Sequence, residues 1–165
     1  MALPNKTKIP VGTVLAGKYR ITREIGRGGM ATVHEAENVD IGKRVAIKVL
    51  AQELTGSSIV VERFLREARA AAAIRSPYIC DVYDSGKLPS GQPFLVLELL
   101  EGESLYERMT RQRQLDAPTT IGLADTRFGM VSLRLDTGLA CFERPAGCLR
   151  YGNLKPSNIV LDERF

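Results

Sequence analysis

The stretch Tyr19-Arg-Ile-Thr-Arg-Glu-Ile-Gly-Arg-Gly-Gly-Met-Ala-Thr-Val-His-Glu-Ala36 decides the fold. Apolar and polar residues alternate over Tyr19–Ile25, which is the period of a half-buried strand. Glycines follow at positions 26, 28 and 29, and Thr32–Ala36 is a second strand candidate. Glycines between two strands let backbone N–H groups approach a phosphate, although hairpin turns also use glycine for conformational reasons alone. The stretch therefore predicts a hairpin and leaves both interpretations of its glycines open.

A lysine and a glutamate make the phosphate interpretation more specific. Arg44-Val-Ala-Ile-Lys-Val-Leu50 is rich in β-branched residues and predicts a third strand, which carries Lys48. Between Ser57 and Arg75 the apolar period changes to about 3.6, which predicts a helix with Ser58 as its N-cap. Glu67 falls in the middle of the apolar face of that helix, where a carboxylate is costly to bury without a partner. We expect Lys48 to be that partner.

The remaining elements complete one compact unit. Tyr78–Ser85 and Pro93–Leu99 predict two more strands, and Gly102-Glu-Ser104 predicts the start of a short helix near the end of the unit at Leu115. Residues 1–17 are polar and rich in proline and glycine, so we expect a flexible leader. After Leu115, glycines and Pro145 interrupt any long helix. Val131–Leu135 and Ile159–Leu161 have strand patterns, the latter without an expected partner.

Composition excludes several classes of function. The chain is 44% apolar and 25% charged, as in an average globular protein, and its net charge of +4 is scattered rather than clustered as a nucleic-acid footprint would be. No signal peptide and no run of about 20 apolar residues is present. The three cysteines include no Cys-x-x-Cys pair, and His34 is the only histidine. We therefore expect no disulfide framework, zinc site, His dyad or membrane helix, and a cytoplasmic location.

In order and spacing, these motifs resemble the protein kinase family, in the form of the bacterial eukaryotic-like serine/threonine kinases. The resemblance covers about Tyr19–Leu115 and includes Phe64-Leu-Arg-Glu-Ala68 and Leu97-Glu-Leu-Leu-Glu-Gly102. It implies an α+β fold: a kinase N-lobe and hinge over residues 18–115, with a five-stranded antiparallel sheet and one long helix. Residues 116–165 would then be a partial, degenerate C-lobe fragment.

The resemblance also implies an ATP site. Lys48 would contact the α- and β-phosphates and pair with Glu67, while Val33 and Ala46 would sandwich the adenine. Backbone groups of Glu98 and Leu100 would bond the adenine edge. The glycine-rich loop would cover the nucleotide, with the positions Ile25, Gly26, Gly28 and Gly29. The loop departs from the family's pattern, because Ala31 replaces its third glycine.

The catalytic loop departs further. Leu154-Lys-Pro-Ser-Asn158 matches the second half of the family's His-Arg-Asp-Leu-Lys-Pro-x-Asn loop, but Asn153 occupies the place of the catalytic aspartate. An amide cannot accept a proton, and general-base assistance is worth about 10² to 10⁴ in rate. Lys155 and Asn158 match the phosphate-contacting lysine and a magnesium ligand. No Asp-Phe-Gly follows before Phe165, so we expect the principal magnesium ligand to be missing and magnesium binding to be doubtful.

Three functions remain open on this sequence. The first is a kinase-like ATP-binding domain with impaired catalysis, the second an active serine/threonine kinase, and the third a non-functional decay fragment. Residues 117–152 lack the period of the helix that the family places there, which suggests a pair of compensating frameshifts. An N-lobe without its C-lobe would expose apolar surface, so a protein partner at that face is a further expectation.

Overall fold

We describe the chain from a computed structural model, which describes residues 9–73, 80–104, 107, 110–111, 132–133 and 159–162. Within these ranges, residues 9–70 and 81–99 form one compact unit, and residues 71–73, 80 and those from 100 onward belong to a second. None of the helices in these ranges has the length and apolarity needed to cross a bilayer.

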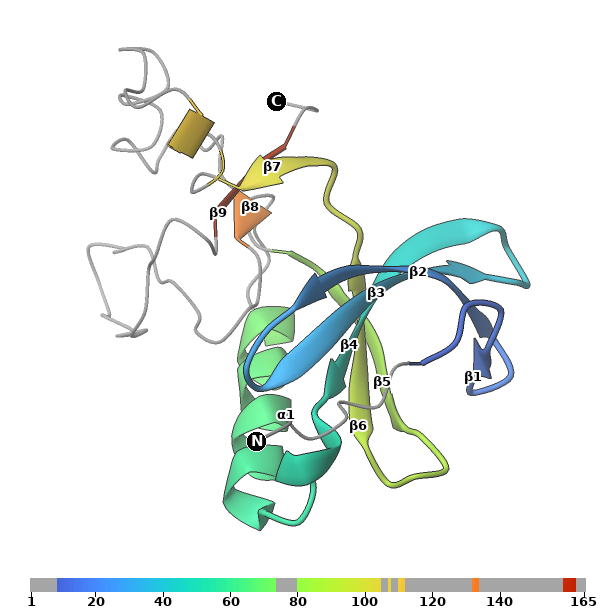
Figure 1. Cartoon of the computed structure of the whole chain (residues 1–165), viewed down its shortest axis with the longest axis vertical. Coiled ribbons are helices and arrows are strands. Elements are labelled where there is room, and N and C mark those ends of the chain that lie inside the picture. The colour runs from blue at the N-terminus through green and yellow to red at the C-terminus, as the bar shows by residue number, and fades with distance from the viewer. Residues whose placement is uncertain are drawn as a thin grey trace, which may run out of the picture. The chain divides into compact units, whose positions relative to one another are not determined.

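The first unit is built on a six-stranded antiparallel sheet (Figure 1). Its strands, in the order β1-β2-β3-β4-β6-β5 across the sheet, are β1 (Val14–Leu15), β2 (Tyr19–Arg27), β3 (Ala31–Asn38), β4 (Lys43–Leu50), β6 (Pro93–Glu98) and β5 (Val82–Lys87). A short 3-10 helix, η1 (Gln52–Leu54), and the helix α1 (Ser58–Ala73) lie between β4 and β5 in the chain. The expected α+β kinase N-lobe is confirmed, with one more strand than the sequence predicts.

The register of the strands divides the sheet into two faces. Ala36 pairs with Ile21 and Val45, and Ile47 pairs with Val96, so these side chains share one face. That face holds a core of buried residues: Ile9, Leu15, Tyr19, Ile21, Ala36, Val45, Ile47, Val49, Leu88, Phe94 and Val96. The Tyr19 hydroxyl on β2 donates to Asp84 Oδ2 on β5 at 3.1 Å, although three strands separate β2 from β5. The sheet is therefore curled around this core.

Helix α1 agrees closely in extent with the expected 57–75, but its cap and its buried stripe differ. The Val61 N–H donates to the Ser57 carbonyl at 3.0 Å, which makes Ser57 the capping position instead of Ser58. The buried side chains on the helix are Phe64, Ala68 and Ala71, spaced four and three residues apart. Glu67 lies at the edge of this stripe, with its side chain 25% exposed. Ile74, the next apolar residue at the same helical period, lies outside the described residues.

The expectation of a flexible leader is wrong for residues 9–17. Val14 and Leu15 form β1, which pairs with Arg20 and Tyr19 of β2, and the Ile21 N–H donates to the Thr13 carbonyl at 2.9 Å. The physical reason is that Ile9 and Leu15 bury their side chains in the core, 8% and 4% exposed. Residues 1–8 lie outside the described ranges.

The second unit contains a three-stranded sheet in the order β7-β9-β8. Its strands are β7 (Gly102–Ser104), β8 (Ser132–Leu133) and β9 (Ile159–Asp162). The strand pattern predicted at Ile159–Leu161 is confirmed, but the strand has partners: Leu161 pairs with Glu103 and Ile159 with Leu133. Gly102–Ser104 is a strand instead of the predicted helix start, because its backbone is paired with β9; the residues described as helical come later, at 107 and 110–111.

Candidate functional site

The glycine-rich loop connects β2 to β3. The pairing slips between Glu24 and Gly26, so Ile25 lies at a bulge before Gly26 meets Val33. Two backbone bonds shape the turn: the Gly28 N–H donates to the Ala31 carbonyl at 2.9 Å, and the Ala51 N–H donates to the Met30 carbonyl at 2.8 Å. Gly29 is exposed, and a Cβ added there would meet no atom within 4 Å. The space beside Gly29 is therefore open to a ligand.

Three of the predicted site residues share the sheet face opposite the core. Val33 on β3 pairs directly with Lys48 on β4, and Ala46 lies two residues along the same strand. On the other side of β4, Lys48 pairs with Leu95 and Ala46 with Leu97, which the sequence places just before the hinge. Ala46 and Lys48 are both buried, 6% and 4% exposed, whereas Val33 is half-buried. An apolar pair and a buried ammonium group thus lie next to each other beside the glycine loop.

Helix α1 brings an aromatic ring to Lys48. The Lys48 Nζ atom lies 5.8 Å from the centroid of the Phe64 ring, within the range of a cation–π contact. The sequence placed Phe64 on the buried face but did not predict this contact. The helical pattern could have found it, because Phe64 lies three residues before Glu67, the residue that the sequence predicts to meet Lys48.

Glu67 has a partner on its own helix. Arg63 Nε donates to Glu67 Oε1 at 2.9 Å, and among the described residues this contact is the salt bridge that Glu67 forms. The two residues are four apart, the spacing at which helical side chains meet, so the sequence alone could have revealed the pair. Among the salt bridges of the described residues Glu67 is joined to Arg63, and its pairing with Lys48 stays a prediction.

The predicted hinge begins at the end of β6. The Glu98 N–H donates to the Asp81 carbonyl at 2.9 Å, and the Asp81 N–H approaches Glu98 Oε2 at 3.4 Å. These bonds fix the backbone of Glu98 beside the buried Leu97. Leu100 belongs to the second unit, so its part in a site with Glu98 stays a prediction.

A charged cluster that the sequence did not predict lies on the face of Lys48. Glu35 is only 7% exposed, and its carboxylate contacts Arg44 Nε at 2.9 Å and Arg23 Nη2 at 2.6 Å. Burial works to raise the pKa of Glu35, but the hydrogen bond from Arg44 and the charges of both arginines outweigh it and lower the pKa below its usual value. Glu35 on β3 pairs with Ala46 on β4, so the cluster borders the predicted adenine site.

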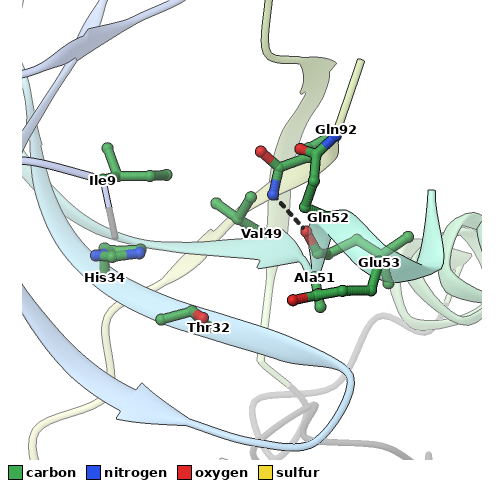
Figure 2. A pocket seen from close by; sticks show the side chains of 9 residues that line it. Ile9, Thr32, His34, Val49, Ala51, Gln52, Glu53 and Gln92 are labelled. Carbon is green, nitrogen blue, oxygen red and sulfur yellow. Dashed lines mark hydrogen bonds between the residues drawn. The ribbon is translucent and has the colours of Figure 1, made fainter. Parts of the chain in front are cut away.

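The one cavity that we describe lies on the other face. It is lined by Ile9, Thr32, His34, Val49, Leu50, Ala51, Gln52, Glu53 and Gln92, and Figure 2 shows Ile9 and His34 at one side of it and Gln92 and Gln52 at the other. Thr32 and His34 alternate with Val33 along β3 and therefore point away from Lys48. This cavity is distinct from the predicted nucleotide site.

The predicted catalytic-loop residues Asn153, Lys155 and Asn158 lie outside the described residues. Within the described ranges, no three His, Cys, Asp or Glu side chains come together as a metal site. The described residues therefore include only part of the predicted site: the glycine loop, Lys48, and the apolar residues Val33, Ala46 and Leu97.

Comparisons with known proteins agree on one family. The model of the protein kinase domain matches residues 19–165. A probable serine/threonine-protein kinase, pknA2 of Bifidobacterium longum, is 40% identical over 154 residues, which cover 92% of this chain and 19% of that protein. The serine/threonine-protein kinase PknA of Mycobacterium tuberculosis is 34% identical over 155 residues, covering 92% and 34%. The chain thus spans about a third or less of the length of these relatives.

The solved structures give the same result at the level of the fold. The crystal structure of the Mycobacterium tuberculosis PknI kinase domain superposes with a TM-score of 0.58 at 26% identity and covers 71% of this chain and 46% of that one. The kinase domain of PF14_0431 superposes with a TM-score of 0.61 at 22% identity, covering 72% and 35%, which bears on the fold alone. The family match extends over most of the chain, and the chain belongs to the protein kinase family.

Proposed function

We propose that the first unit binds ATP on the sheet face that carries Val33, Ala46 and Lys48. The observation that carries the proposal is the burial of Lys48, 4% exposed, directly opposite Val33 and next to Ala46. A lysine on a strand beside a glycine-rich loop is where the family holds nucleotide phosphates.

Each described residue has a role in this proposal. Val33 and Ala46 offer apolar contacts to the two sides of the adenine, and the backbone at Glu98 offers its edge a hydrogen-bonding group. Lys48 places a positive charge at the phosphates, and Gly29 leaves room for them to approach the loop backbone. Bound ATP would supply the phosphoryl group, and the residues of this chain bind and orient it.

We further propose that phosphoryl transfer is impaired. Asn153 stands where the family has the aspartate that accepts or orients the substrate hydroxyl proton. An amide keeps the shape of that group but lacks its basicity, so the expected rate loss is about 10² to 10⁴. A serine/threonine kinase with full activity and a decay fragment without ligand binding are the two alternatives. The assignment of residues 18–115 and 116–165 to N-lobe and degenerate C-lobe is part of the same proposal.

A thermal-shift titration with ATP tests nucleotide binding. The chain should gain stability by RT ln(1 + [ATP]/Kd), about 2.7 kcal/mol at one hundred times the Kd. Lys48→Met keeps the apolar stem and removes the charge, so its stability should respond far less to ATP. Lys43→Met is the matched control, because Lys43 lies at the exposed start of the same strand. Equal responses of all three proteins, or no response of the unaltered chain, would refute the proposal.

The transfer step needs its own assay. The unaltered chain and Asn153→Asp are compared for γ-phosphate transfer to a generic protein substrate with magnesium. If Asn153 limits catalysis, the aspartate variant should transfer about 10² to 10⁴ times faster. Full activity of the unaltered chain supports the active-kinase alternative. Binding of ATP by both proteins without transfer by either would show that a defect other than Asn153 limits the reaction.

Three finer expectations belong to the same proposal. Magnesium would be held in part by Asn158, with ATP titrations in the presence and absence of magnesium as the test. We also expect a cytoplasmic location. A protein partner would cover the surface at which a kinase N-lobe meets its C-lobe.

A further inference from the structure

His34 is buried without a hydrogen-bond partner. Its side chain is 1% exposed at the centre of β3, and neither Nδ1 nor Nε2 has a partner among the described residues. A neutral imidazole carries one donor and one acceptor, and buried polar groups without partners are rare in folded proteins. The proposed ATP site does not use this residue, because His34 points to the opposite face of the sheet.

The cavity beside His34 has room for little more than a water molecule. Its volume is about 10 Å³, close to the minimum that one water needs. Polar groups of Thr32 and Gln92 also line it, and Gln92 Nε2 donates to the Leu50 carbonyl at 2.9 Å. A single water can therefore satisfy a neutral His34, but the hydration of an imidazolium requires more space than a cavity of this volume offers.

The charged groups around His34 do not offer a direct partner. On β2, Glu24 pairs with the backbone position of His34, but its carboxylate is bound by Arg27 Nε at 2.8 Å. On β4 the neighbours are the apolar Ile47 and Val49, and Glu53 of η1 lies at the exposed rim of the cavity. Burial lowers the pKa of His34 from 6.5; the charge of Glu24 works to raise it and that of Arg27 to lower it.

Among the parts of the chain that line the cavity, the N-terminal segment is the easiest to displace. Ile9 lines the cavity and is 8% exposed, and it precedes a segment tied to β2 by the Gly12 N–H to Ile21 carbonyl bond at 2.8 Å and the Ile21 N–H to Thr13 carbonyl bond at 2.9 Å. The other lining residues lie on β3 and its partner β4, on η1 and the residue before it, and at Gln92, whose side-chain amide is bonded to the Leu50 carbonyl. Water reaches the ring with the least disruption by displacing Ile9.

We propose that protonation of His34 releases the N-terminal segment Ile9–Leu15 from the core of the curled sheet. Above pH 6.5 the ring is neutral in the folded and the unfolded chain, so the segment is fully stabilised. As the pH falls below 6.5, states that expose the ring bind a proton more readily than the closed state does. One proton is coupled to the opening, so the open population rises by at most about tenfold per pH unit.

The experiment uses the full chain and its single histidine. Because His34 is the only histidine, its imidazole proton signals are unambiguous in NMR spectra recorded from pH 7.5 to 5. Amide exchange of Gly12 and Ile21 reports on the segment, and that of Ile47 reports on the central sheet. We expect an apparent pKa below 6.5 and a loss of protection at Gly12 and Ile21, corrected for intrinsic exchange, while Ile47 stays protected. An ordinary titration without loss of protection, or equal losses at all three amides, would overturn the proposal.

Variants separate the role of the His34 ring from that of Ile9, which covers it. His34→Gln and His34→Phe cannot titrate, so protection of Gly12 and Ile21 should no longer depend on pH; two variants are used because one of them could fail to fold. Ile9→Ala keeps the ring and removes the cover, so the apparent pKa of His34 should move up toward 6.5. A pH dependence that persists without His34, or an unchanged pKa in Ile9→Ala, contradicts the proposal.

Discussion

Arg63 Nε lies 2.9 Å from Glu67 Oε1, one turn away on α1, and this salt bridge engages the carboxylate that the kinase resemblance assigns to Lys48. The Arg63 side chain is 55% exposed, so water screens the pair. In addition, a basic residue N-terminal to an acidic one is the less favourable order on a helix. The salt bridge is consequently weak, at about 0.3 to 0.5 kcal/mol.

Removal of Arg63 should make Glu67 more available to Lys48. For Arg63→Ala we expect ATP to bind up to about twofold more tightly, because 0.5 kcal/mol corresponds to roughly that factor. Isothermal titration with ATP measures the change, and Arg66→Ala on the exposed side of the helix is the control. A weaker affinity in Arg63→Ala than in the control would show that Arg63 helps to form the site.

The loop glycine and a sheet glycine should respond in opposite ways to alanine. A Cβ at Gly29 meets no atom within 4 Å, whereas a Cβ at Gly86 would lie 2.5 Å from the Phe94 ring. Gly29→Ala should therefore leave the free energy of unfolding within about 0.5 kcal/mol and weaken ATP binding, because the methyl group enters the space left for the phosphates. Gly86→Ala should cost roughly 1–3 kcal/mol by overpacking. Denaturant unfolding and ATP titration of both variants check this contrast.

Local sequence patterns suffice to predict those strands whose residues are neighbours in the chain. The alternation in Tyr19–Ile25 and the β-branched run Arg44–Leu50 predict β2 and β4 closely, because strand period and turn chemistry are local properties. The prediction of a flexible leader relied on its prolines and glycines, whereas the order of residues 9–17 comes from Ile9 and Leu15, which pack into a core formed by residues distant in sequence. The Arg63–Glu67 salt bridge was missed for a related reason. A helical wheel ranks residues by apolarity and does not include competition between cations.

Glu35 should make the fold sensitive to acid. Its folded pKa lies below the unfolded value, so its contribution to stability is complete above about pH 4.5 and is lost as the pH falls through the folded pKa. We expect Glu35→Gln to lose about 1 kcal/mol at pH 7, a modest value because Arg23 and Arg44 are 63% and 54% exposed. The difference from the unaltered chain should shrink as the pH falls below 4.5. Urea unfolding at several pH values measures it, and a constant difference would count against the cluster.

The hydrogen bond from Tyr19 to Asp84 should stabilise the curl of the sheet. The bond is 3.1 Å long and joins β2 to β5, and it works together with burial to raise the pKa of Tyr19. Tyr19→Phe removes only the hydroxyl, so we expect a loss of about 0.5 to 1.5 kcal/mol in the free energy of unfolding. Tyr83→Phe is the matched control: Tyr83 is 41% exposed, and its ring contact with Lys43 at 3.9 Å survives in phenylalanine. Equal stability of the two variants would mean that apolar packing alone holds β2 and β5 together.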